Sequence, residues 1–273
     1  MKTIIAPTDF SDVSLNAVNY AADLAAFVNA EVVLLNIIQI PMTVTESSFT
    51  DFEYNEMWDE ANYELALISD RLRLRTSDKI KICTKVLIGS VTHELEEICE
   101  RKKPFAVVMG TKGVGAGELF FAGSNTMSAV NTLDIPVLVV PENISFTGIK
   151  TIVLATDLEG IDPLKPVQFL REWLEIFEAK LEIINVIEHG SVAADAVPTS
   201  VSLQNLLSAF RPEFHFIEKG NIEEGVYSFI EEHHAEILVI IPKAHGFFSG
   251  LFHKSRSKPF ILHPHIPVLA ISE

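Results

Sequence analysis

The 273-residue chain has few basic side chains, only two cysteines and no long apolar segment. Its 21 Lys and Arg residues are outnumbered by 37 Asp and Glu residues, which gives a formal net charge of −16. This balance argues against a duplex nucleic-acid partner, because such binding depends on neutralising phosphates with Lys and Arg. It argues equally against an anionic membrane surface. No apolar run approaches the roughly 18 residues of a membrane-spanning helix, so we expect neither kind of partner.

The N-terminal segment and the cysteines bear on the cellular compartment. Pro7 and Asp9 stand where a signal peptide would have its long apolar region, so we expect a cytoplasmic protein. Cys83 and Cys99 are separated by 15 residues and form no metal or redox motif. We therefore expect two reduced thiols in the core.

An internal repeat organises the chain. Residues 2–9 (KTIIAPTD) recur as 150–157 (KTIVLATD), and residues 135–140 (IPVLVV) recur as 266–271 (IPVLAI). Between them, 31–38 (EVVLLNII) is echoed by 180–187 (KLEIINVI). Self-similarity of this kind indicates repeated units of one fold. The sequence therefore predicts two domains, 1–145 and 146–273, joined within residues 141–148.

Short apolar runs alternate with amphipathic stretches in both copies. In the first copy we expect strands at 3–6, 32–38, 80–88, 105–109 and 135–140, and helices at 11–29, 49–75, 92–102 and 124–132. Strands near Thr151, Leu181, His215, Ile237 and Ile266 repeat the pattern. Such alternation is typical of α/β domains. The prediction is two tandem domains, each a five-stranded parallel sheet with helices on both faces.

The most unusual segment is 109–126, which leaves a predicted strand, contains five glycines and enters a helix at Ser124. Free N–H groups at a helix N-terminus and close backbone approach at glycine suit a phosphate. Ser124 and Thr126 would add hydroxyls and Lys112 a charge. The alternative is a flexible loop before an ordinary serine cap. Neither the P-loop nor the dinucleotide-binding glycine fingerprint fits the sequence.

A family resemblance accounts for this segment. The spacing Gly110-x2-Gly113-x9-Gly123-Ser124 is similar to the G-x2-G-x9-G-[ST] element of nucleotide-binding universal stress proteins. Residues 7–11, 34–37 and 135–140 resemble the first, second and last strand regions of that family. With the repeat, the chain resembles the tandem, two-domain members over nearly its whole length. The resemblance implies a Rossmann-like, adenine nucleotide alpha hydrolase-like fold that binds ATP with Mg²⁺.

The resemblance also implies roles for particular residues. Asp9 and the backbone at Ile37 would hold the adenosine end, and Pro7 would shape the first turn with Thr8. The remaining implied contacts are Met109, Gly110 and Gly113 on the ribose and α-phosphate side, and Gly123, Ser124, Asn125 and Thr126 at the outer phosphates. Thr111 and Lys112 are further candidates for binding the cofactor. Asn125 replaces an aliphatic residue common in the family. For Asp9 the alternative is a helix N-cap, a position that aspartate favours.

The second copy lacks the glycines of the first. Pro242 stands in place of Gly110 and Lys254 in place of Gly123, so we expect no standard ATP site there. Lys254 and Ser255 would suit a smaller anion at most. Eight of the nine histidines lie in this half. His253, His263 and His265 raise the question of zinc, but we expect solvated or hydrogen-bonded histidines and assign no metal ligands.

These features favour a nucleotide-dependent stress-response switch or scaffold with no catalytic residues. The alternatives are a slow ATPase or autophosphorylating phosphotransferase, and a scaffold that binds no nucleotide. Besides adenine nucleotide, we expect a protein partner or homodimer. Within the chain, the two Ile-Pro-Val-Leu strands would pair the domains as a pseudo-dimer, as their counterparts pair between subunits in family dimers. The aromatic segment from Phe49 to Tyr63 predicts a helix over the sheet edge, or else a lid or partner surface.

Overall fold

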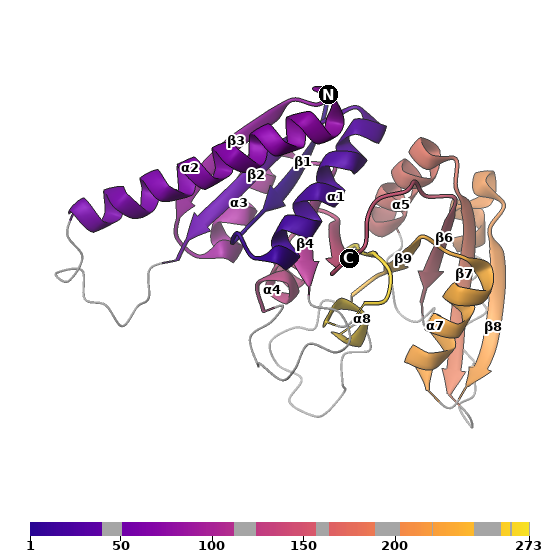
Figure 1. Cartoon of the computed structure of the whole chain (residues 1–273). Coiled ribbons are helices and arrows are strands. Elements are labelled where there is room, and N and C mark those ends of the chain that lie inside the picture. The colour runs from indigo at the N-terminus through magenta and orange to yellow at the C-terminus, as the bar shows by residue number, and fades with distance from the viewer. Residues whose placement is uncertain are drawn as a thin grey trace.

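The computed structural model describes residues 1–39, 51–111, 124–156, 164–188, 203–219, 221–242, 258–262 and 264–272. Strands and helices alternate along the chain, as the sequence predicts (Figure 1). The first half contains β1 (Lys2–Pro7), α1 (Asp12–Val28), β2 (Ala30–Ile38), α2 (Asp51–Thr76), β3 (Ile82–Ile88), α3 (Val91–Lys102), β4 (Ala106–Thr111), α4 (Ser124–Thr132) and β5 (Val137–Pro141). The second contains β6 (Thr151–Ala155), α5 (Leu164–Phe177), β7 (Lys180–Glu188), the 3₁₀ turn η1 (Ser208–Phe210), β8 (Glu213–Lys219), α7 (Ile222–His233), β9 (Ile237–Ile240), α8 (Lys258–Leu262) and β10 (Val268–Ala270).

The ten strands of the described residues form one sheet, in the order β3-β2-β1-β4-β5-β10-β9-β6-β7-β8. The strands within each half are parallel, and the halves join where β5 and β10 pair antiparallel, with Leu138 opposite Leu269. The expected pairing of the two Ile-Pro-Val-Leu strands is therefore observed. The two predicted five-stranded sheets are continuous with each other through this antiparallel seam.

The strands alternate their side chains between two apolar layers, one on each face of the sheet. In β1, Ile4 packs in the layer formed with α1, α2 and α5, while Ile5 packs in the layer formed with α3, α4, α7 and α8. Strands that are covered on both faces are apolar throughout, which explains the unbroken hydrophobic runs. α1 approaches the sheet through small buried residues, including Ala17, Ala21 and Ala25.

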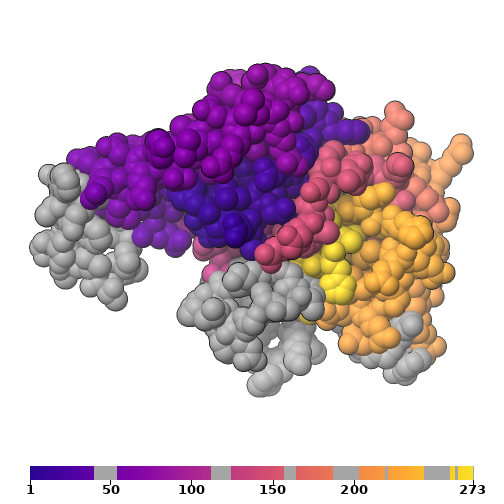
Figure 2. All heavy atoms as spheres, viewed as in Figure 1, coloured from indigo at the N-terminus to yellow at the C-terminus, as the bar shows by residue number. Residues whose placement is uncertain are grey.

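The two halves also meet through side chains outside the seam. Phe105, just before β4, stacks on Trp173 of α5 with ring centroids 4.8 Å apart. Phe27 of α1 stacks on Phe177 of α5 at 5.2 Å, and Lys2 forms an ion pair with Glu172. In Figure 2 the surfaces of the halves meet along a continuous boundary. The connection between β5 and β6 spans residues 142–150, close to the predicted join.

α2 covers the sheet only with its C-terminal part. Leu65, Ile68 and Leu72 are buried, whereas Trp58 and Tyr63 are exposed. Figure 1 shows the N-terminal part of this helix extending beyond the sheet. The predicted helix is confirmed, but its aromatic side chains in the described region do not cover the sheet edge. Among the described helices, none combines the length and the apolar character of a membrane span.

Candidate functional site

The expected site lies at the point in the sheet where the order of the strands reverses. From β1 the chain continues to β2 on one side, and β4 pairs with β1 on the other. In open parallel sheets, ligands bind outside the carboxyl ends of the strands at such a switch point. Asp9 follows the carboxyl end of β1, and Gly110 and Thr111 form that of β4. α4 then begins at Ser124.

The loop after β1 is fixed by hydrogen bonds from two neighbouring elements. The Thr8 amide donates to the Leu35 carbonyl (2.8 Å), and Asn36 Nδ2 of β2 donates to the Thr8 carbonyl (2.9 Å). The Thr8 hydroxyl lies 2.8 Å from the Ser14 hydroxyl of α1 and accepts from the Phe10 amide at 3.0 Å. Thr8 itself is buried, while Pro7 ends β1 half-buried. The loop is thereby held before any ligand binds.

Asp9 presents an exposed carboxylate from this loop. Its Oδ1 accepts hydrogen bonds from the Ser11 amide (3.1 Å) and the Ser11 hydroxyl (2.6 Å). Partial burial raises the pKa of Asp9, but hydrogen bonds from Ser11 and Ser14 outweigh this and hold it below its ordinary value. The N-cap of α1 is Ser11, whose side chain accepts from the Ser14 amide. The alternative in which Asp9 caps the helix is therefore wrong.

Gly110 is required by the packing of α1 against β4. A Cβ atom at this position would lie 2.5 Å from the Val13 carbonyl oxygen, which is closer than any side chain permits. The Thr126 hydroxyl of α4 donates to the Gly110 carbonyl at 3.0 Å. Met109 and Thr111, on either side, are buried. One backbone position thus brings together the start of α1, the end of β4 and the start of α4.

The N-terminus of α4 presents Ser124 and Asn125 to solvent, while Thr126 is buried. Its first turn carries no acidic side chain. The first four N–H groups of a helix lack partners within the helix, and the helix dipole is positive at this end. Lys112, Gly113 and Gly123 lie outside the described residues, so their phosphate contacts stay predictions. Ile37 lies half-buried in β2, opposite Leu87 of β3.

Asn36, the buried amide that holds the loop after β1, was not among the predicted site residues. A signal was available, because the repeat places Asn185 at the corresponding position. Asn185 Nδ2 donates to the Thr156 carbonyl at 3.0 Å, and the Thr156 amide donates to the Ile184 carbonyl at 3.1 Å. The second half therefore keeps the loop support of the first. Pro242 follows β9, whereas Asp157, Lys254 and Ser255 lie outside the described residues.

Both cysteines are free, as expected. Burial raises the pKa of the Cys99 thiol to about 12, so this group stays protonated at neutral pH. Cys83 is only half-buried. The buried thiol fits a packing role in α3.

Comparison with known proteins decides the family. A family model for universal stress proteins matches residues 1–141. The chain belongs to the universal stress protein family. A universal stress protein of Methanocaldococcus jannaschii is 31% identical over 140 residues, which cover 51% of this chain and 81% of the relative.

Solved structures extend the fold to both halves of this universal stress protein. The chain is similar to a universal stress protein from Archaeoglobus fulgidus, with a TM-score of 0.76 at 18% identity, over 99% of this chain and 98% of that one. A functionally unknown protein from Pseudomonas aeruginosa PAO1 matches with a TM-score of 0.62 at 11% identity, over 100% of this chain and 92% of that one. At these identities the likeness shows the fold alone. The predicted family and α/β fold class are confirmed.

Proposed function

We propose that the first half binds ATP with Mg²⁺ at the carboxyl ends of β1 and β4, and that the bound nucleotide acts as a switch. The observation that carries the proposal is a continuous set of contacts at the switch point of the sheet. Asp9 bonds to Ser11, Val13 lies against Gly110, and Thr126 bonds to Gly110. Three segments distant in sequence therefore converge where the glycine-spaced segment leaves the sheet.

The residues at this site suit the two ends of the ligand. The exposed Asp9 carboxylate would accept hydrogen bonds on the adenosine side, beside the backbone of Ile37. The N–H groups at the start of α4, with Lys112, Gly113 and Gly123 before it, would meet the phosphates. Because the protein carries a net charge of −16, it needs backbone donors and a metal ion to hold a polyphosphate. Mg²⁺ supplies that neutralisation when it binds with the nucleotide.

The position of α4 supports a switch. Its N-terminus lies at the proposed phosphate site, and it packs against α8 of the second half. Beyond its other end, Ser272 donates to the Leu133 carbonyl at 2.8 Å. A ligand that orders the start of α4 would therefore favour one arrangement of the halves, which is the population shift that a switch requires.

Calorimetric titration of the full-length protein with ATP and Mg²⁺ tests the proposal. We expect saturable binding that Asp9→Ala weakens at least about tenfold, equivalent to roughly 1.4 kcal/mol. Gly123→Asp should abolish binding, because it places a carboxylate beside the phosphates. Asp70→Asn is the matched control, since Asp70 is an exposed acid on α2. Unchanged binding in both site variants, or no binding by the parent protein, would overturn the proposal.

Single-turnover measurements separate the switch from a slow ATPase. We expect ATP to be recovered intact, because the described part of the site offers no base dedicated to activating water. ADP formation that Asp9→Ala abolishes would instead assign hydrolysis to this site.

A further inference from the structure

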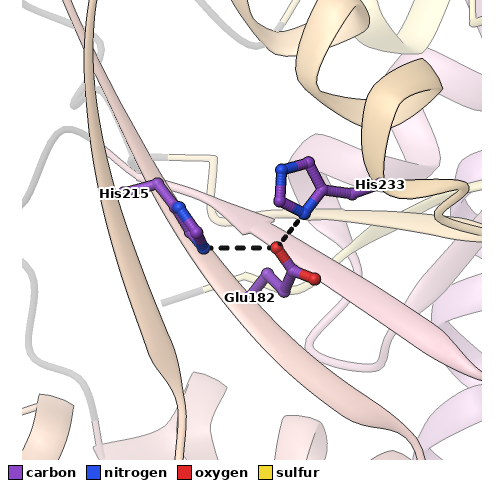
Figure 3. Close-up of side chains that lie close together, drawn as sticks. All are labelled: Glu182, His215 and His233. Carbon is purple, nitrogen blue, oxygen red and sulfur yellow. Dashed lines mark ion pairs between the residues drawn. The ribbon is translucent and has the colours of Figure 1, made fainter.

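A second cluster of functional side chains lies at the opposite end of the sheet, near the amino ends of β7 and β8. It consists of Glu182 from β7, His215 from β8 and His233 from the last turn of α7. Figure 3 shows both imidazole rings directed at one carboxylate oxygen. Glu182 Oε2 lies 3.2 Å from His215 Nε2 and 2.6 Å from His233 Nδ1. One ligand atom from each of the three residues lies within 4.8 Å of the others.

Two buried polar atoms of this cluster make ion-pair contacts but no hydrogen bond. The side chain of Glu182 is only 2% exposed. Among the described residues, Glu182 Oε2 and His215 Nε2 have no hydrogen-bond partner, despite their short separations from neighbouring polar atoms. A buried carboxylate oxygen and a buried imidazole nitrogen without a hydrogen bond each keep a lone pair for a bound ion.

The first half provides an internal comparison. The register places Glu182 opposite Val153 of β6, where the first half has Val33 opposite Ile5. Val33 is an apolar residue of the core and is 3% exposed. His215 likewise corresponds to Lys85. His215 lies opposite Ile184, two residues after Glu182 on β7, and Lys85 lies opposite Leu35, two residues after Val33 on β2. The fold itself therefore requires neither a carboxylate nor an imidazole at these positions.

We propose that Glu182, His215 and His233 bind a divalent transition metal ion, with zinc as the best match. Two imidazole nitrogens and one carboxylate oxygen form a ligand set that zinc uses with water in the fourth position. The histidine side chains are 27% and 25% exposed, so an ion can enter beside the rings, although Glu182 Oε2 and His215 Nε2 are themselves buried. Tetrahedral coordination requires the ligand atoms to move apart slightly, which the half-buried histidine rings permit. The bound ion would connect edge strand β8 and the end of α7 to β7.

Lys180 orients the carboxylate for this role. Its Nζ atom lies 3.0 Å from Glu182 Oε1 and 2.9 Å from Glu213 Oε2. One carboxylate oxygen is thereby engaged by an ammonium group, and the other is left facing the histidines. Phe229 of α7 stacks on His233 with ring centroids 3.8 Å apart and lies 4.8 Å from the His215 ring, so it packs against both imidazoles.

Zinc titration of the chelator-treated full-length protein tests the proposal. We expect one equivalent of tight binding, which His233→Gln and Glu182→Val weaken by more than the roughly 10–100-fold typical of losing an outer-shell partner. Glu182→Val installs the residue of the first half, and Lys180 keeps its ion pair with Glu213, so its ammonium group is not left unpaired. This variant should therefore fold without metal.

Matched controls assign the bound zinc to the cluster. His93→Gln alters an exposed histidine that pairs with Glu97 on α3, so it should leave binding unchanged. A triple variant, His245→Gln, His253→Gln and His263→Gln, tests three of the six other histidines of the second half and should leave zinc binding unchanged. Zinc should also raise the Tm of the parent protein but not that of Glu182→Val. No zinc bound by the parent protein would overturn the proposal, as would tight binding that survives Glu182→Val and His233→Gln.

Discussion

Asn36 of β2 and Asn185 of β7 are equivalent residues that support the same loop in the two halves, and only the first half keeps the glycine spacing. Each amide is buried or nearly so and donates to the backbone carbonyl that follows the first strand of its half. The bond fixes the chain just before Asp9 in the first half and just before Asp157 in the second. Both halves therefore keep the hydrogen bond that supports the loop, whereas only the first half keeps the glycines expected to bind a ligand.

Replacing each asparagine by alanine should give equal losses of stability and unequal losses of binding. We expect Asn36→Ala and Asn185→Ala each to lower the free energy of unfolding by about 1–3 kcal/mol, because a buried carbonyl loses its donor. Asn36→Ala should also weaken ATP binding, since the Asp9 loop is released. Urea denaturation and calorimetric titration measure the two effects. Equal ATP affinity in both variants would contradict this prediction.

Individual site residues were predictable only where a local pattern marked them. Asp9, Gly110 and Ser124 lie at strand and helix ends that periodicity locates, and the structure brings their segments together. The reason for Gly110 was not predictable, because Val13 approaches it from a helix distant in sequence. The Glu182 cluster was missed for the same reason, since two strands and a helix supply its three side chains.

At the scale of elements, α3 and α7 occupy equivalent places in the two halves but begin differently. Asn221 caps α7 with a side chain that accepts from the Glu223 amide at 2.8 Å. Ser90 occupies the N-cap of α3 but makes no side-chain hydrogen bond there. Equivalent helices thus differ in how their first N–H groups are satisfied.

This difference predicts unequal effects of the same substitution. Asn221→Ala should lower the free energy of unfolding by about 0.5–2 kcal/mol, the usual effect of losing an N-cap. Ser90→Ala should change it by less than about 0.5 kcal/mol, because no capping bond is lost. Chemical denaturation of both variants measures the two values. A larger loss from Ser90→Ala would contradict the assignment of the caps.

Strands and helices were predicted well because their hydrophobic periods are local. Their limits were less predictable, because neighbours set them. β4 continues past the expected Met109 to Thr111, since Thr111 still pairs with Pro141 of β5. β5 in turn begins at Val137, after the expected Ile135. The length of a strand depends on how far its partner continues, which a linear pattern does not contain.

At the scale of the whole molecule, the sheet and both apolar layers continue across the β5–β10 seam. Leu138 and Leu269 face each other there, and both are fully buried. Trp173 and Phe105 add a second contact between the halves. We therefore expect the halves to unfold together as one cooperative unit.

Substitution at the seam tests this cooperativity. Leu269→Ala should lower the free energy of unfolding by about 2–5 kcal/mol and shift a single calorimetric transition for the whole chain. Leu74→Ala is the control, because Leu74 is 81% exposed on α2. Two separate transitions, with only one of them shifted by Leu269→Ala, would show that the halves are independent.

The antiparallel seam also removes a restriction that symmetric dimers obey. In a homodimer joined about a twofold axis, each substitution appears in both subunits, so both copies of a site change together. Here the two halves are encoded separately within one polypeptide, and their ratio is fixed at one to one. Each half can therefore diverge alone, as Val33 and Glu182 show at equivalent positions. The shared architecture is retained while its two ends are free to acquire different chemistry.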